Sequence, residues 1–417
     1  MTIQQKQSSY VTWFCVVLFF CYQYLLRVIP GVMVSDLRSE FNITAEQFGT
    51  LGAFYLYIYS LMQIPIGIAT DRIGVKNTVL GSILLCLIGA FMLAITKSFE
   101  FAQLSRVLMG AGSACAFMGC LKVVSDNFPP GKRGFLMGAT LTFGTLGALS
   151  AGAPLTYLIN HFGWRQAVFV LAALGVVVFL ITLFGVSGSR DLNKMSPPLN
   201  ASKMKTDLLS VLKNKSIMLY AFLAIALYTP LSVVSDLWGV AFFMEKHGFP
   251  RAEAAQICMY MYAGLCVGSL FMTWWAEKYN VLNLTIQICS IVILALFVIL
   301  IFGPVFSQET LSVLVFCLGL ACGAEMLCFA GVALYANKDK IGVTLGVANT
   351  LNMLGGAILQ QGIGIILDML WSGKVDQQGL RVYSTADYQA ALSILLAVIA
   401  ICCCVAFLLP RQRKSAA

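Results

Sequence analysis

Charged residues are scarce in this sequence. They make up 11% of its 417 residues, whereas 59% are hydrophobic. The mean hydropathy is +0.85. A water-soluble chain of this length needs far more ionic surface than this. The scarcity of charge therefore excludes a soluble globular protein and indicates a chain that is solvated by lipid.

Histidine is almost absent too, with His161 and His247 as the two examples, and both fall in expected loops. The fourteen cysteines lie almost entirely within apolar runs and show no ligand spacing beside a histidine. There is no Ser/His/Asp set and no phosphate-binding loop. We therefore expect no metal site, no cofactor and no enzymatic activity.

Long apolar runs are what the sequence has in abundance. A run of about 20 predominantly apolar residues crosses a bilayer core as a helix, and runs that are apolar all round do not match the alternation of barrel strands. We expect an all-α membrane protein with 12 transmembrane helices, at roughly residues 10–34, 46–69, 77–96, 100–125, 134–158, 165–185, 217–243, 252–275, 281–303, 310–336, 341–367 and 388–409.

The orientation follows from the basic residues. The first run is too long for the apolar region of a cleaved signal, so we expect it to stay in the membrane. An even number of spans places both termini on one side, and most lysines and arginines fall in the loops and tails of that side. We expect a multi-pass protein of a cell inner membrane, and the positive-inside rule predicts that both termini are cytoplasmic. The net charge of +9 then reflects topology and anionic lipid headgroups, and it requires no nucleic-acid partner.

The chain divides into two halves. Its one long polar segment, residues 187–215, contains Pro197 and Pro198, with six predicted spans before it and six after it. This is the arrangement of a transporter built from two six-helix repeats. We expect an amino-terminal six-helix bundle at 1–186, a cytoplasmic linker at 187–215 and a carboxy-terminal six-helix bundle at 216–417.

Two motifs carry a family resemblance. After the second span stands Gly67-Ile-Ala-Thr-Asp71-Arg72-Ile-Gly74-Val-Lys76, which resembles the cytoplasmic signature Gly-x-x-x-Asp-Arg-x-Gly-x-Lys/Arg of the major facilitator superfamily. In the fourth span, Arg106-Val-Leu-Met-Gly110-Ala-Gly112 resembles the second signature of that family, Arg-x-x-x-Gly-x-Gly. The resemblance implies two six-helix bundles around a central cavity, lined by spans one, four, seven and ten, and usually a monomer.

The first motif also suggests a gate. Gly67 permits close helix packing, Gly74 permits a tight turn and Asp71 can lie against a helix amino terminus. Lys122 lies about 160° around its helix from Arg106, and Asp126 follows it at i+4, which favours a local ion pair joined to Asp71 and Arg72. The predicted gating residues are Gly67, Asp71, Arg72, Gly74, Lys76, Lys122 and Asp126.

Two arginines within spans point to an anionic substrate. A buried arginine costs several kcal/mol and should face a bundle interior or a water-filled cavity. Arg27 shares a helix face with Gln23 and Tyr24, and a guanidinium pairs well with a carboxylate. Two alternatives remain open: Arg106 can instead bind backbone carbonyls of neighbouring helices and hold its half together, and Arg27 can extend toward the outer interface.

Polar stripes supply further candidates for contact with substrate. Asn349, Asn352 and Gln360 lie on one helical stripe of span eleven, while Tyr55 and Tyr59 lie on one of span two. Both helices border the cavity in the family that the motifs resemble. The alternative is a set of interhelical hydrogen bonds, each contributing about 0.6 kcal/mol.

Two acids within spans are candidates for proton coupling. Glu325 is the one acid near the middle of a span, and burial disfavours its charged form, so it can take up and release a proton near neutral pH. A permanently protonated glutamate that bonds across helices is the alternative. Asp236 shares a face with Tyr228, a further candidate for substrate contact, and has either a cavity role or a gating role.

We therefore predict a secondary transporter that takes up a small carboxylate-bearing solute with protons, by alternating access. The segment around Arg27, together with Tyr55 to Pro65, resembles a bacterial branch that includes phagosomal nutrient transporters, and organic anion symporters are a more distant resemblance. The alternatives are an importer of a carboxylate siderophore or nucleoside, an efflux pump, and a membrane receptor or sensor that no longer transports.

Overall fold

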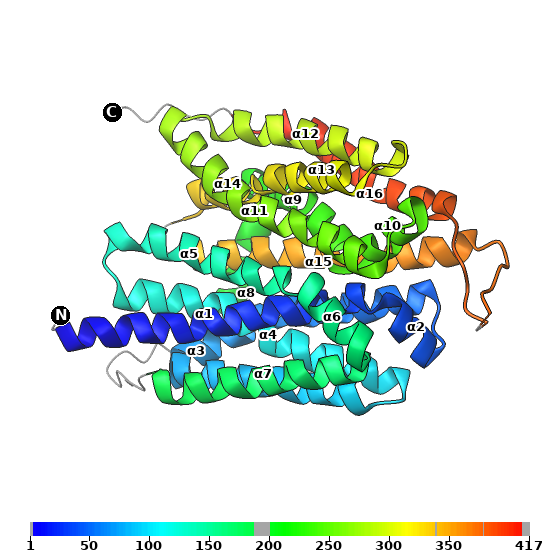
Figure 1. Ribbon diagram of the computed structural model, residues 1–417. Coiled ribbons are helices and arrows are strands. Elements are labelled where there is room, and N and C mark those ends of the chain that lie inside the picture. The colour runs from blue at the N-terminus through cyan, green and yellow to red at the C-terminus, as the bar shows by residue number, and fades with distance from the viewer. Residues whose placement is uncertain (1–2, 187–200, 338–339, 378, 411–417) are drawn as a thin grey trace.

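The computed structural model describes residues 3–186, 201–337, 340–377 and 379–410. Within these residues the regular structure is helical, and an isolated bridge between Val375 and Arg381 is the sole β-type pairing. The two ends of the described chain lie at one end of the bundle (Figure 1), which we call the terminal end. The other end is called the opposite end.

The first half of the chain forms one layer of helices (Figure 1): α1 (Ile3–Val32), α2 (Val34–Phe41), α3 (Ala45–Ile95), α4 (Phe99–Asn127), α5 (Pro130–Leu149), α6 (Ala153–Phe162) and α7 (Trp164–Gly185). Helix α3 has 51 residues and would be about 76 Å long at 1.5 Å per residue, more than twice the thickness of a bilayer core. Gly74, at φ 82° and ψ 161°, interrupts it. Helix α3 therefore supplies two spans.

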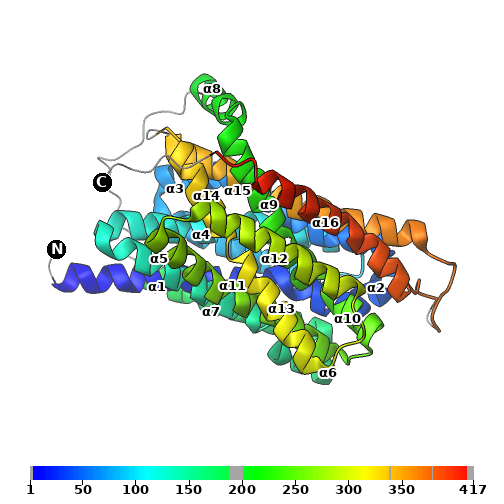
Figure 2. The same ribbon diagram turned by 90° about the horizontal axis from the view of Figure 1, so that it is seen from above.

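The second half forms the other layer: α9 (Lys215–Pro230), η2 (Leu231–Trp238), α10 (Gly239–His247), α11 (Arg251–Tyr279), α12 (Leu282–Phe302), α13 (Gln308–Cys322), α14 (Glu325–Tyr335), α15 (Ile341–Leu370) and α16 (Thr385–Ala406). Helix α8 (Ala201–Leu212) falls within the predicted linker and projects from the bundle (Figure 2). Residues 187–200 of that linker lie outside the described residues.

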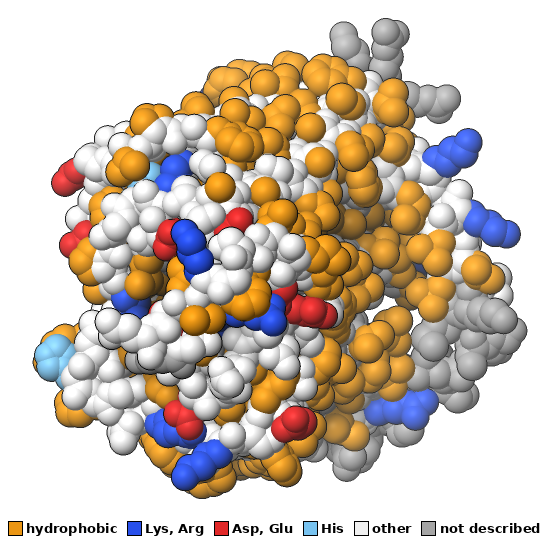
Figure 3. Space-filling view, turned by 90° about the vertical axis from the view of Figure 1, so that its right-hand side faces the viewer, with side chains coloured by type: hydrophobic (Ala, Val, Ile, Leu, Met, Phe, Trp, Pro, Cys, Tyr) orange, Lys and Arg blue, Asp and Glu red, His pale blue; other side chains and the backbone are white. Residues whose placement is uncertain are grey.

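Among the described residues, eleven helical segments are long and apolar enough to cross a membrane, and one of them is the double span α3. The prediction of an all-α membrane protein with twelve transmembrane helices is thus confirmed. Figure 3 shows the opposite end, where charged side chains gather while hydrophobic side chains cover the flanks. That distribution suits a molecule whose sides face lipid and whose ends face water.

Span seven is irregular at its centre. Pro230 has no N–H, so the carbonyl of Ala226 loses its usual helical partner; it accepts the hydroxyl of Thr229 at 3.3 Å instead. The chain then continues as the π-helix η2, in which Asp236 lies. Such wide turns are rare and are often found at functional sites.

Span ten is also interrupted, between α13 and α14. Gly323 lies in the break, where a Cβ would come within 2.3 Å of the backbone of Gly268 on α11. The close approach of α11 therefore accompanies the break. As a result, Glu325 is the first residue of a new helix, α14, rather than a residue within a continuous one.

The two halves meet at the opposite end and separate toward the terminal end. A Cβ at Gly364 of α15 would lie 2.4 Å from the carbonyl oxygen of Ala45 of α3, and one at Gly49 would lie 2.8 Å from that of Gln360. Farther along the same two helices, a Cβ at Gly67 or Gly346 would meet no described atom within 4 Å. The structure is therefore closed at the opposite end.

Small residues hold α11 against α13, and this contact generates a stability prediction. A Cβ on Gly268 would lie 2.0 Å from the carbonyl oxygen of Leu320, so we expect Gly268→Ala to destabilise the protein by about 1–3 kcal/mol. Gly346→Ala is the matched control, because its Cβ meets open space and alanine favours a helix by roughly 0.5–1 kcal/mol. Thermal unfolding in detergent measures both, and equal melting temperatures would contradict the packing argument.

Candidate functional site

The centre of the interface between the halves holds a buried ion pair. Arg27 of α1 lies 2.7 Å (Nη2) from Oδ2 of Asp236 in η2, and its Nε donates to the same oxygen at 2.8 Å. The side chains are 7% and 2% exposed. The two residues come from different halves, so the pair joins the bundles through charges that have been removed from water.

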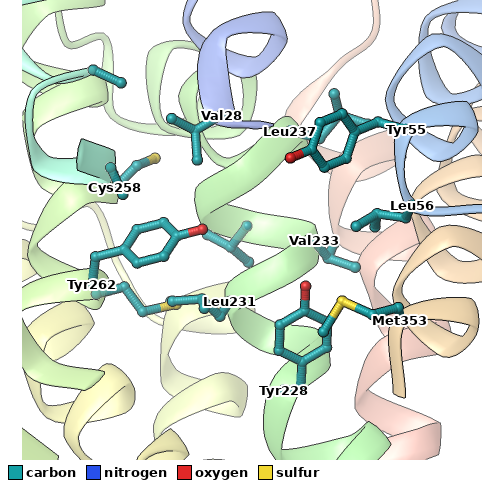
Figure 4. Packing of buried hydrophobic residues seen from close by; sticks show 14 of the residues in the cluster. Val28, Tyr55, Leu56, Tyr228, Leu231, Val233, Leu237, Cys258, Tyr262 and Met353 are labelled. Carbon is teal, nitrogen blue, oxygen red and sulfur yellow. The ribbon is translucent and has the colours of Figure 1, made fainter. Parts of the chain in front are cut away.

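Aromatic side chains surround this pair. The Arg27 guanidinium lies 5.2 Å from the ring centroid of Tyr228 and 5.8 Å from that of Tyr24. Tyr262 of α11 donates its hydroxyl to Oδ1 of Asp236, and its ring meets that of Tyr24 edge to face. Figure 4 shows the rings of Tyr228 and Tyr262 among buried aliphatic side chains of the same interface. The Asp236 carboxylate thus has a partner on each oxygen.

Arg106 lies beside this cluster but contacts mainly backbone. Its Nη1 donates to the carbonyl of Leu26 at 2.8 Å, and its Nη2 donates to that of Arg27 at 3.2 Å. The guanidinium also lies 4.6 Å from the ring centroid of Tyr55. These are the contacts of the structural alternative that the sequence left open. In this closed arrangement Arg106 fixes the turn of α1 that carries Arg27.

Gln23, Tyr55 and Tyr59 form a second polar group inside the amino-terminal half. Tyr55 donates its hydroxyl to Oε1 of Gln23 at 2.9 Å, and the rings of Tyr55 and Tyr59 stack. Gln63, one turn farther along α3, is buried and has no hydrogen-bond partner for either side-chain polar atom among the described residues. Buried amides are normally paired, so Gln63 adds unused hydrogen-bonding capacity to this group.

The carboxy-terminal half contributes Glu325 and the stripe of α15. Oε1 of Glu325 accepts a hydrogen bond from Nδ2 of Asn352 at 2.6 Å, and both side chains are buried. Gln360 donates to the carbonyl of Ser232 at 2.7 Å. Asn349, on the same helix, is half-buried.

Three buried polar groups on α15 and on the neighbouring α9 have no hydrogen-bond partner within the described part of the chain. They are Oδ1 of Asn352, Oε1 of Gln360 and the hydroxyl of Tyr228, all of which lack a hydrogen-bond partner among the described residues. Buried polar groups in folded proteins are normally paired. Asn352 and Gln360 of α15 and Tyr228 of α9 therefore retain unused hydrogen-bonding capacity.

The predicted gating residues lie near the terminal end. Lys122 pairs with Asp71 at 3.2 Å and with Asp126 at 3.5 Å, as the spacing predicted, and all three side chains are more than one-third exposed. Gly74 adopts the positive φ expected for its turn. Arg72 and Lys76 lie on the same segment of α3, exposed and half-buried respectively.

Two expectations for this gate differ from the structure. Gly67 does not serve close packing here, because a Cβ at that position would meet no described atom within 4 Å. Asp71 contacts Lys122 of its own half rather than a helix amino terminus. The open space at Gly67 is matched on α15, where a Cβ at Gly346 also meets no described atom within 4 Å.

Sequence reasoning missed Tyr262, which contacts Asp236. A tyrosine within an apolar run is normally interpreted as a packing residue, and no sequence spacing connected Tyr262 in span eight with Asp236 in span seven. It also missed a polar network at the opposite end, built on Asp368, Arg381 and Tyr383. The signal there was an acid one residue beyond the predicted end of span eleven.

Within the described residues, no three histidine, cysteine or acidic side chains form a potential metal site.

Comparison with known proteins agrees with this architecture. The sequence profile of the Major Facilitator Superfamily matches residues 13–359. The crystal structure of a bacterial homologue of the human lysosomal transporter Spinster, in an inward-facing and occupied conformation, superposes with a TM-score of 0.76 at 18% identity, covering 98% of this chain and 99% of that one.

Two relatives by sequence are named for organic acids. The gentisate transporter of Corynebacterium glutamicum is 22% identical over 378 residues, which is 88% of this chain and 83% of the relative. The probable sulfoacetate transporter SauU of Cupriavidus necator is 27% identical over 175 residues, and the match spans only 41% of either chain.

The chain thus belongs to the Major Facilitator Superfamily. It is a multi-pass membrane transporter and not an enzyme, as the sequence predicted.

The buried pair generates a second stability prediction. Asp236→Asn leaves the Arg27 guanidinium buried without a counter-charge, so we expect a loss of about 3–5 kcal/mol in the free energy of unfolding. The double variant Arg27→Met with Asp236→Leu should be more stable than Asp236→Asn, because it removes both charges. Lys122→Ala is the control: its ion pairs are exposed, and it should cost at most about 1 kcal/mol. Thermal unfolding measures the stability of each variant. If Lys122→Ala had the lowest melting temperature, the prediction would be wrong.

Proposed function

We propose that this transporter carries a small carboxylate-bearing solute into the cell together with protons. The two halves rock about the Arg27 site in an inner membrane, with both termini cytoplasmic. In this orientation the terminal end faces the cytoplasm, and the closed opposite end faces outward. The structure then corresponds to an inward-facing state.

One observation carries this proposal: the buried guanidinium of Arg27 has a counter-ion that belongs to the other half. When the halves separate at the opposite end, Asp236 moves away with its bundle, and Arg27 is left needing an anion. A planar guanidinium binds a carboxylate through two parallel hydrogen bonds. A carboxylate that arrives from outside takes the place that Asp236 occupies in the closed state.

Neighbouring groups would hold the rest of the solute. Tyr24 and Tyr228 already flank the guanidinium, and their rings offer an apolar surface for the carbon skeleton. Gln23, Tyr55, Tyr59, Asn349, Asn352 and Gln360 provide polar groups from both halves. The unpaired acceptors of Asn352 and Gln360 suit a hydroxyl or amino donor on the solute.

Arg106 supports the site from behind. Its bonds to the carbonyls of Leu26 and Arg27 fix the backbone that presents the Arg27 guanidinium. Removing Arg106 would therefore weaken binding by misplacing Arg27 rather than by deleting a contact with the solute.

Glu325 is the proposed proton carrier. It is buried and accepts a hydrogen bond from Asn352, and the described residues place no cation in an ion pair with it. A buried carboxylate without a counter-charge favours protonation. Asp236 is better suited to closing the site, since Arg27 and Tyr262 hold its charge.

At the terminal end we assign gating to Gly67, Asp71, Arg72, Gly74, Lys76, Lys122 and Asp126. The ion pairs of Lys122 with Asp71 and Asp126 keep this segment ordered while the end is open. Their exposure keeps the contribution small, so the segment can exchange partners when the end closes.

The anion site is tested by substituting Arg27. Arg27→Ala should lower the affinity for the carboxylate solutes that bind the unmodified protein by at least about tenfold, because a charge-assisted bidentate contact is lost. Arg27→Lys should retain part of the affinity for these solutes, because lysine keeps the positive charge. Arg165→Ala is the control, since Arg165 pairs with Glu40 within one half. Thermal-shift titration with organic acids, amino acids, nucleosides and ferric carboxylate chelates measures the affinities.

The same screen separates the solute classes. Binding of nucleosides alone, or unchanged affinity for a carboxylate in Arg27→Ala, would overturn the anion site.

Proton coupling is tested at Glu325. Glu325→Gln keeps the shape of the side chain but cannot release a proton, so we expect proteoliposomes to lose accumulation driven by an inward proton gradient while solute exchange across the membrane continues. The control Glu309→Gln changes an exposed acid in the first turn of α13, and this variant should accumulate solute normally. Full accumulation by Glu325→Gln would show that the proton is carried elsewhere.

A further inference from the structure

The amino terminus of α3 leaves two backbone donors that its own half does not satisfy. Thr44 and Gln47 form a capping box: Oγ1 of Thr44 accepts from the backbone N–H of Gln47, and Oε1 of Gln47 accepts from that of Thr44. The N–H groups of Ala45 and Glu46 remain. The first N–H groups of a helix have no partner within it, so these two need an external acceptor.

The acceptor comes from the other half of the protein. Asp368, near the end of α15, accepts from the N–H of Glu46 through Oδ2 at 2.8 Å, while Oδ1 lies 3.4 Å from the N–H of Ala45. The hydroxyl of Tyr383 also accepts from the N–H of Ala45, at 3.1 Å. A carboxylate in this position is further favoured by the positive end of the helix dipole.

Two more residues of the carboxy-terminal half hold Asp368 in place. Arg381 donates to Oδ1 of Asp368 at 3.1 Å, and Tyr383 donates its hydroxyl to the same oxygen. Burial, followed by the hydrogen bond to Asp368, raises the pKa of Tyr383, so its hydroxyl remains a donor.

Arg38 of the amino-terminal half completes the network. It donates to the carbonyl of Arg381 at 2.7 Å, and its guanidinium lies 5.0 Å from the ring centroid of Tyr383. The contacts of Arg38, Ala45 and Glu46 with Asp368, Arg381 and Tyr383 all join one half to the other.

We propose that Asp368 is the gating residue of the opposite end, where it caps α3 in trans and so holds the two halves together. The inference rests on the alternating movement of the halves proposed above. When this end opens, the N–H groups of Ala45 and Glu46 lose their acceptors, and Asp368 retains only the partners in its own half. The cap therefore exists in one of the two states and favours that state.

Water has access to the network, which keeps the gate reversible. A cavity of about 340 Å³ adjoins it, lined by residues of both halves that include Arg38, Arg381 and Tyr383. Water from this cavity can take over the freed N–H groups and carboxylate oxygens as the halves part. The network then shifts the balance between states without locking the protein in one of them.

The proposal is tested by the distance between the halves at the opposite end. Donor and acceptor fluorophores are attached through genetically encoded residues at Lys97 and Val305, two exposed loop positions in different halves. Single-molecule energy transfer in proteoliposomes without solute gives the ratio of open to closed molecules. We expect Asp368→Ala to raise this ratio by roughly tenfold or more. Asp368→Asn should have a smaller effect, because asparagine also caps helices.

Asp387→Ala is the matched control. Asp387 also caps a helix amino terminus, but it belongs to the capping box of α16, and its hydrogen bonds to described residues stay within its own half. It should leave the ratio unchanged. An unchanged ratio in Asp368→Ala, or an equal rise in Asp387→Ala, would overturn the proposal.

The measurement requires no knowledge of the solute or the coupling ion, so its failure is distinguishable from failure of the Arg27 or Glu325 assignments. If Asp368→Ala proves too unstable to label, the double variant Arg38→Ala with Tyr383→Phe tests the same network while keeping Asp368. A raised ratio there supports the proposal, and an unchanged ratio contradicts it.

Discussion

The ion pair between Arg27 and Asp236 is the constraint around which the protein is arranged. Removing a guanidinium and a carboxylate from water is expensive, and the cost is offset only when the two charges lie close together with their remaining hydrogen bonds made. Since each charge belongs to a different half, the pair holds the two bundles together in the closed arrangement described here. The stability of this ion pair therefore depends on how the two six-helix bundles are placed relative to each other.

Other elements of the structure serve that pair. The π-helix after Pro230 places Asp236 in the interface, Tyr262 supplies its second oxygen with a donor, and Arg106 fixes the backbone of Arg27. At the same end, Asp368 satisfies the N–H groups of α3 that the capping box leaves over. Contacts between the halves thus stabilise the closed opposite end, and in the proposed alternating movement these contacts would be lost when the halves separate.

The sequence determined what depends on composition and local pattern. Low charge and twelve apolar runs were enough for a helical membrane protein, because lipid leaves the backbone few alternatives. The family signatures led to the correct superfamily. The i+4 spacing of Lys122 and Asp126 predicted a pair that is present, and Gly74 predicted a turn with positive φ. Each of these inferences concerns residues close together in the chain.

Only the tertiary structure decided which distant residues meet. Arg27 and Asp236 are 209 positions apart, and Asp368 is 322 positions from Glu46, so no spacing rule connects them. The break before Glu325 accompanies the close approach of α11, as Gly323 against Gly268 shows. The separation of α3 and α15 around Gly67 also depends on how the two halves pack, which no local pattern specifies. Local sequence pattern determines where the helices form, whereas contacts between the two halves determine which residues of those helices meet.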